Sequence, residues 1–195
     1  MDLFHVTFTI LFLAMAAIRV YYRLQARTGR KEPRKAEPAV VLAKILLGAP
    51  AMLAILVYLF RPQMLNWSNL ALPPAWRWAG AAILAVSVAG LAWVHSTLGR
   101  NFSTELRIRP DQTLVTSGPY RYVRHPMYSA FFLLFSGMGL LAANWFIGTA
   151  GLLALILIVL FRVSREEEMM VNAFGDQYRR YASTTGRFLP RVRST

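Results

Sequence analysis

Five long apolar runs constrain this chain more than any other feature. Each approaches the ~20 residues that a helix needs to cross about 30 Å of hydrocarbon. The chain is 56% hydrophobic and only 16% charged, whereas about a quarter of the residues in a soluble domain are charged. We therefore expect an all-α integral membrane protein that forms one membrane domain over residues 1–195, with five transmembrane helices: Leu3–Tyr22, Ala39–Phe60, Trp78–Val94, Met127–Ala143 and Trp145–Val163.

The distribution of basic residues predicts how these helices are oriented. Of the 22 lysines and arginines, six lie in residues 23–38, five in residues 99–126 and seven in the tail from Arg162, whereas Arg61 and Arg77 lie on the opposite side. Short cytoplasmic loops are enriched in Lys and Arg. The N-terminus is therefore expected outside, and the C-terminus in the cytoplasm. The basic loop 23–38 is interpreted as an anchor to anionic membrane lipids.

Several classes of function are disfavoured by the residues that are absent. The net charge of +13 is explained by topology, so nucleic acid is not expected as a partner. No Asp or Glu lies in any of the five runs, which argues against a transporter. The chain has no cysteine, and its three histidines are scattered, so no metal site is expected. His95 either lines a site or contacts lipid headgroups.

The stretch SGPYRYVRHPMY, Ser117 to Tyr128, places a turn and a cationic cluster at the start of the fourth run. Pro126 suits the first position of a helix, with His125 as the cap. The helix dipole and Arg121 and Arg124 would favour a bound anion there. The alternative is an ordinary basic flank whose side chains reach lipid headgroups.

The tail adds acidic groups on the same side of the membrane. We expect the fifth helix to continue past the membrane through REEEMMVNAF and to end at Gly175. Arg162 and Glu166 are four residues apart and share a helix face. Because the fourth and fifth helices form a hairpin around Asn144, that face is expected near His125 and Tyr128. Such a set suits a zwitterionic, nucleotide-like ligand. The alternative is a solvated helix face with local ion pairs.

LGRNFS, TLVTSGPYRYVRHPMY, REEE, FGDQYRRY and GRFLP, in this order, resemble the isoprenylcysteine carboxyl methyltransferase family, and most of all its short prokaryotic five-span members. The resemblance covers about His95 to Val192. More distantly, the chain is similar to phospholipid N-methyltransferases. The resemblance implies S-adenosyl-L-methionine as cofactor, in a cytoplasmic pocket built from the last two helices, the loop before them and the tail.

The resemblance also implies roles for individual residues. Arg162 matches the arginine for the substrate carboxylate, and Glu166 and His125 complete the expected catalytic set. The contact expected in the loop 105–111 has no clear match because this loop is shorter than in the animal enzymes. The cofactor contacts of the family fall on Gln112, Thr113, Leu114, Val115, Tyr120, His125, Pro126, Met127, Tyr128 and Glu166.

We therefore expect residues 95–195 to form the catalytic core, with the hairpin 127–163 and the tail, and residues 1–94 to supply the first three helices. The methyl acceptor would be lipophilic, like an isoprenylcysteine, and would enter from the bilayer. Gly137 and Gly139 either open a gap for it or allow close helix packing. The alternatives for the whole chain are a phospholipid amine or small-thiol methyltransferase, and a non-catalytic membrane scaffold.

Overall fold

The computed structural model describes residues 2–27, 38–99 and 113–191. Every regular secondary-structure element in these ranges is a helix, and the only β pairings in them are isolated bridges. The five long helices coincide with the five apolar runs of the sequence. In chain order the elements are α1 (Leu3–Arg27), α2 (Pro38–Phe60), η1 (Pro62–Ser68), α3 (Pro74–Leu98), η3 (Gly118–Arg121), α4 (Pro126–Ala142) and α5 (Trp145–Thr184).

Three of these helices are long and apolar enough to cross a membrane: residues Leu3–Gln25 of α1, all of α3, and α5. The apolar stretches Gly48–Phe60 and Pro126–Ala142 are shorter. An all-helical chain with this much apolar surface confirms the prediction of an integral membrane protein. The total of five transmembrane helices stays a prediction.

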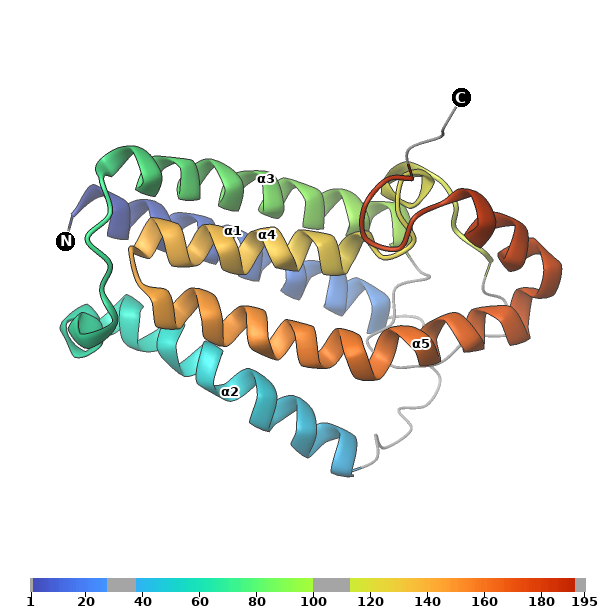
Figure 1. Cartoon of the computed structure of the whole chain (residues 1–195), viewed down its shortest axis with the longest axis horizontal. Coiled ribbons are helices and arrows are strands. Elements are labelled where there is room, and N and C mark those ends of the chain that lie inside the picture. The colour runs from blue at the N-terminus through green and yellow to red at the C-terminus, as the bar shows by residue number, and fades with distance from the viewer. Residues whose placement is uncertain (1, 28–37, 100–112, 192–195) are drawn as a thin grey trace.

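The helices form a bundle whose centre is α4 (Figure 1). This helix packs between α3 and α5, while α1 contacts α3 and α4, and α2 contacts α5. At the right of Figure 1, the C-terminal part of α5 leaves the bundle and turns back toward η3. The core is apolar, and its largest fully buried side chains include Phe8, Leu84, Leu91, Met138, Leu141 and Ile147.

The hairpin between α4 and α5 closes around one buried amide. Ala143 adopts a left-handed conformation with φ 50°, and the Asn144 side chain caps α5 by accepting a hydrogen bond from the Ile147 amide at 3.1 Å. The Asn144 side-chain amide also donates to the Ser68 hydroxyl at 2.8 Å. Since Asn144 is fully buried, these bonds fix the end of the bundle opposite the polar tail. The predicted hairpin is confirmed.

Close packing, and not an opening, explains the glycines of α4. A Cβ on Gly137 would lie 2.7 Å from the Leu84 backbone nitrogen, and one on Gly139 would lie 2.9 Å from Cα of Gly148. Their interpretation as a lateral gap for the acceptor is therefore wrong, and the alternative of close helix packing is confirmed.

Replacing Gly137 with alanine is expected to destabilise the protein by about 1–3 kcal/mol, because the backbone of α3 must move away. The thermal unfolding midpoint in a fixed detergent measures the effect. Gly48→Ala is the matched control. It meets nothing within 4 Å and should be neutral or slightly stabilising. Equal midpoints for Gly137→Ala and the parent would contradict the close contact between α3 and α4.

Candidate functional site

The polar cluster lies where α4 begins and α5 extends beyond the apolar bundle. Pro126 occupies the first turn of α4 and His125 is its N-cap residue, as predicted. The preceding turn η3 begins at Gly118, which has φ 56° and lies so close to the end of α3 that a Cβ would come within 2.6 Å of the Thr97 hydroxyl. The turn thus holds the start of α4 against α3.

The helix α5 continues well past its apolar part, as predicted, but it does not stop at Gly175. This residue has φ 51° and ψ −127° and breaks the helix, which then resumes to Thr184. After the break the chain runs back toward η3, where the Tyr181 hydroxyl donates to the Tyr120 carbonyl at 2.6 Å (Figure 1). The break therefore returns the tail to the start of α4.

Glu166 is the first of two carboxylates that organise the cluster. Its Oε1 accepts hydrogen bonds from the Tyr128 hydroxyl at 3.0 Å, from Arg162 Nη2 at 3.0 Å and from Arg162 Nε at 3.2 Å. The His125 Nδ1 lies 3.8 Å from Oε2. The expected meeting of His125, Tyr128, Arg162 and Glu166 is therefore present. The Glu166 side chain keeps 24% of its surface exposed.

Glu167 is the second carboxylate, and the sequence analysis missed it. Its Oε1 accepts from Arg124 Nε at 3.0 Å and lies 3.2 Å from His125 Nε2. Arg187 of the tail donates from Nη2 to Oε2 at 2.6 Å. Successive residues on a helix are rotated by about 100°, so Glu166 and Glu167 contact different partners, while Glu168 is exposed.

The tail closes over this cluster through its backbone. The amides of Arg124 and His125 donate to the carbonyls of Gly186 and Arg187 at 2.8 and 2.9 Å, and the Ser129 hydroxyl donates to the Phe188 carbonyl at 2.7 Å. Residues 186–188 are called the strap below. A Cβ on Gly186 would lie only 2.0 Å from the Leu189 carbonyl oxygen, so the turn of the strap requires glycine.

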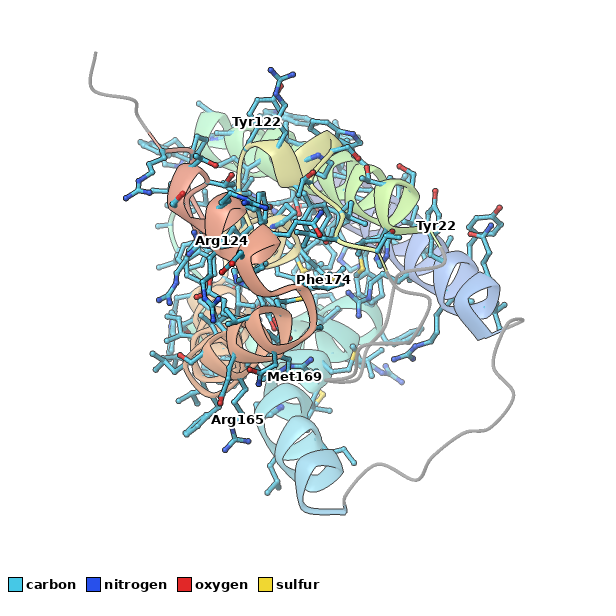
Figure 2. The ribbon with its side chains drawn as sticks, turned by 90° about the vertical axis from the view of Figure 1, so that its right-hand side faces the viewer. Tyr22, Tyr122, Arg124, Arg165, Met169 and Phe174 are labelled. Atoms are coloured by element: carbon cyan, nitrogen blue, oxygen red, sulfur yellow. The ribbon has the colours of Figure 1, made fainter. Side chains whose placement is uncertain are left out.

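Figure 2 looks onto this end of the molecule. Arg124 lies among the side chains between η3 and the last turns of α5, whereas Arg165 projects from the outer side of α5. Arg124 also donates from Nη1 to the Ala182 carbonyl at 2.7 Å. Arg124 is thus a structural cation that joins α4 to the tail, and it is not available as a free anion-binding group.

Burial and charge set the protonation of these groups. Burial lowers the pKa of His125, outweighing the opposite effect of the carboxylates Glu167 and Glu166. Burial acts to raise the pKa of Glu167, but hydrogen bonds from Arg187 and His125 and the charge of Arg124 outweigh it, so the pKa is lowered. Burial, with Glu167 nearby, raises the pKa of Tyr178 to about 12. At neutral pH the cluster therefore holds a neutral imidazole beside an ionised Glu167.

The other residues that the resemblance assigns to the cofactor lie in different surroundings. Burial, followed by the charges of Tyr181 and Glu166, raises the pKa of Tyr120. Pro126 is buried, and Met127 packs toward the apolar core. The segment Thr113, Leu114 and Val115 precedes η3 in irregular backbone. Gln112 and the loop 105–111 lie outside the described residues.

His95 and His5 are both buried side chains. The His95 ring is 1% exposed and stacks on Tyr22 with ring centroids 5.3 Å apart. His5 is 4% exposed and lies against the Tyr58 ring, with the ring centroids 5.0 Å apart. Within the described ranges, no group of three or more His, Cys, Asp or Glu side chains is placed to hold a metal ion. The absence of a metal stays a prediction.

Sequence comparison shows a similarity to one protein family. Residues 80–172 match the profile of the isoprenylcysteine carboxyl methyltransferase (ICMT) family. Over these 93 of its 195 residues, the chain is similar to this family. The match covers α3, α4 and most of α5, and thus the helices that carry Tyr128, Arg162, Glu166 and Glu167.

Individual relatives are consistent with that assignment. The protein-S-isoprenylcysteine O-methyltransferase of Schizosaccharomyces pombe is 39% identical over 84 residues, which are 42% of this chain and 35% of that protein. The nickel-cobalt-cadmium resistance protein NccN of Alcaligenes xylosoxydans xylosoxydans is 32% identical over 117 residues, 59% of this chain and 53% of that protein. The matched regions thus span about a third to a half of these relatives.

One solved structure shares the fold. The eukaryotic intramembrane Ras methyltransferase ICMT superposes with a TM-score of 0.55 at 20% identity, covering 94% of this chain and 67% of that one. The similarity includes α1 and α2, which the family profile does not cover. The first two helices are therefore part of the shared membrane fold.

Glu167→Gln is expected to loosen the strap, because Arg187, Arg124 and His125 lose a common anion. Trypsin cleavage after Arg187 at pH 8 should accelerate several-fold, and the unfolding free energy should fall by about 2 kcal/mol. Glu168→Gln, on the exposed side of α5, is the control and should change neither. An unchanged cleavage rate in Glu167→Gln would contradict this role.

The same carboxylate predicts a pH dependence. Because its pKa is lowered in the folded protein from an ordinary value of 4.5, the stabilisation by Glu167 is complete above that value. It is lost as the pH falls through the folded-state pKa. The difference in unfolding midpoint between the parent and Glu167→Gln should therefore shrink below about pH 4. A difference that persisted at pH 2 would contradict the ionised state.

Proposed function

We propose that this chain is an S-adenosyl-L-methionine-dependent methyltransferase that methylates the carboxylate of an isoprenylcysteine-like lipophilic substrate. The observation that carries the proposal is the partly exposed Glu166, held by Tyr128 and Arg162 beside His125 where α5 leaves the apolar bundle. The similarity of residues 80–172 to the ICMT family supports the reaction class.

The chemistry of the cluster fits the proposed methyl donor. S-adenosyl-L-methionine carries a cationic sulfonium, an ammonium and an adenine ring, and it supplies an activated methyl group. Glu166 offers a partly exposed carboxylate for the ammonium or the ribose hydroxyls, and the rings of Tyr120 and Tyr128 offer aromatic surface near a cation. His125, neutral at pH 7, and the first turn of α4 would take the remaining polar groups. The residues Gln112, Thr113, Leu114, Val115, Pro126 and Met127 stay part of this proposal through family resemblance.

The acceptor needs orientation more than activation. A carboxylate is ionised at neutral pH, so the protein requires no strong general base, and its tasks are to position the acceptor and exclude water. Arg162 would hold one acceptor oxygen by charge-assisted hydrogen bonds. Glu166 fixes the direction of the Arg162 guanidinium, and the strap covers the cluster from the aqueous side.

The arrangement of the chain in the membrane follows from the same proposal. The catalytic core would be residues 95–195, with residues 1–94 completing the bundle, and the cluster would face the cytoplasm with the N-terminus outside. The water-soluble donor then arrives from the cytoplasm and the lipophilic acceptor from the bilayer. An amine or small-thiol acceptor is the alternative, but an amine would require a base and would have less use for Arg162. A scaffold would have no need for the polar cluster.

Glu166→Gln is expected to weaken binding of S-adenosylhomocysteine by about tenfold, because the carboxylate that would receive the ligand's ammonium or ribose loses its charge. Isothermal titration calorimetry of the purified protein measures the affinity, with Glu168→Gln as the control. Unchanged affinity in Glu166→Gln would remove this residue from the donor site.

Arg162→Ala should reduce turnover of a prenylated cysteine carboxylate by at least a hundredfold, while affinity for S-adenosylhomocysteine changes much less. Transfer of a labelled methyl group to the carboxylate measures turnover. If donor affinity fell and turnover at saturating donor did not, Arg162 would belong to the donor site instead.

A further inference from the structure

A second feature of interest is a cavity inside the bundle, separate from the Glu166 cluster. It has a volume of about 200 Å³ and lies between α1, α2 and α3. Most of its wall is apolar, but two arginines, one helical turn apart, belong to its lining. The lining residues are Phe12, Met15, Ala16, Arg19, Val20, Arg23, Met52 and His95.

Arg19 is partly buried, and no counter-ion for it lies among the described residues. Its Nη1 is inaccessible to solvent and has no hydrogen-bond partner. Its guanidinium carbon lies 4.8 Å from the centre of the Phe131 ring, a cation–π contact that offsets only part of the cost of burial. In the described part of the chain, neither Arg19 nor Arg23 forms an ion pair with a carboxylate.

The surrounding helices cannot supply the missing anion. The sequences of α1, α2, α3 and α4 contain no Asp or Glu at all. An unpaired cation in a membrane-spanning helix is costly and marks a functional site. Within the described part of the chain, these four helices therefore leave Arg19 without an anion, and a bound anionic ligand would supply one.

Arg19 and the proposed catalytic cluster contact neighbouring residues of α4. Phe131 lies three residues after Tyr128 on α4, about 4.5 Å further into the bundle, and residues at this spacing are neighbours on a helix surface. Tyr128 in turn binds Glu166. Tyr22, which stacks on His95 at the wall of the cavity, lies on the α1 side of the same end (Figure 2). An anion at Arg19 would thus sit on the membrane side of the cluster.

We propose that Arg19, assisted by Arg23, captures the carboxylate of the lipophilic acceptor as it enters from the bilayer between α1 and α2. This inference rests on the proposed function. Its support is charge complementarity: the lining combines apolar side chains with the partly buried Arg19 and the exposed Arg23, and the acceptor is an anionic head on an apolar chain. Val20 and Met52 are exposed at 55% and 50%, so the chain can lie along apolar surface.

The proposal also explains how product would leave. Arg162 is occupied by Glu166 at two of its nitrogens, so the free cation Arg19 is the stronger attraction for an arriving carboxylate. Methylation converts the carboxylate into a neutral ester and removes that attraction. The site would then prefer a new acceptor over the product, and Arg19 would act as a positioning and selectivity residue.

The test compares a carboxylate probe with its methyl ester, which lacks the negative charge. N-acetyl-S-farnesylcysteine and its methyl ester are titrated against the full chain in phosphatidylcholine nanodiscs, without methyl donor. Arg19→Gln should weaken binding of the carboxylate by about tenfold and leave the ester unchanged, and Arg19→Lys should retain part of the preference. Arg61→Gln, an exposed arginine at the other end of the bundle, should alter neither affinity.

Each other outcome overturns the proposal. Equal binding of the carboxylate to parent and Arg19→Gln would exclude the capture role. Equal loss for both probes, or a lowered unfolding midpoint, would assign Arg19 to structure. If phosphatidylglycerol in the nanodiscs abolished the Arg19-dependent preference, a lipid headgroup would be the occupant. Failure of the parent to bind S-adenosylhomocysteine would reject the proposed function separately, because the probe titration contains no donor.

Discussion

The Glu167 carboxylate is the interaction on which the polar end of the molecule depends. It joins Arg124 and His125 at the start of α4, its own helix α5, and Arg187 in the tail. Its side chain is only 14% exposed, so each bond forms with little competition from water and removing one partner would leave buried charge. Glu167 therefore holds both His125, the N-cap residue of α4, and the strap. The position of His125 beside Glu166 depends on this carboxylate.

The two adjacent carboxylates, Glu166 and Glu167, have different roles. Glu167 receives hydrogen bonds from two arginines and lies within reach of His125, so it has little capacity left for a ligand. Glu166 has fewer partners, more exposure at 24%, and an Oε2 that lies 3.8 Å from the neutral His125 Nδ1. A helix rotates about 100° per residue, which lets neighbours in the chain face two different surroundings. Glu167, whose hydrogen-bonding capacity is largely used, builds the site, and Glu166, which has capacity left, is the one suited to a ligand.

Local rules account for what the sequence could predict. Apolar runs located the five helices, the missing amide of Pro126 placed it in the first turn, and four-residue spacing paired Arg162 with Glu166. The Glu167 network joins residues 43 and 20 positions apart, so it depends on how α4, α5 and the tail meet. Gly175 was expected to end the helix. The break is there, but the resumption to Thr184, which carries the tail back, is decided by tertiary contacts such as Tyr181 with Tyr120.

The distribution of charge separates two kinds of arginine in this protein. Arg124 and Arg187 share the carboxylate of Glu167, Arg162 pairs with Glu166 and Arg77 with Asp2, so their burial or orientation is explained within the chain. Arg19 has an apolar wall and a phenyl ring around it and no carboxylate on any helix that surrounds it. Replacing it by an apolar residue would relieve the cost of burying an unpaired cation. An anion that binds at Arg19 during part of the protein's working cycle, as proposed above, would account for an arginine at this position.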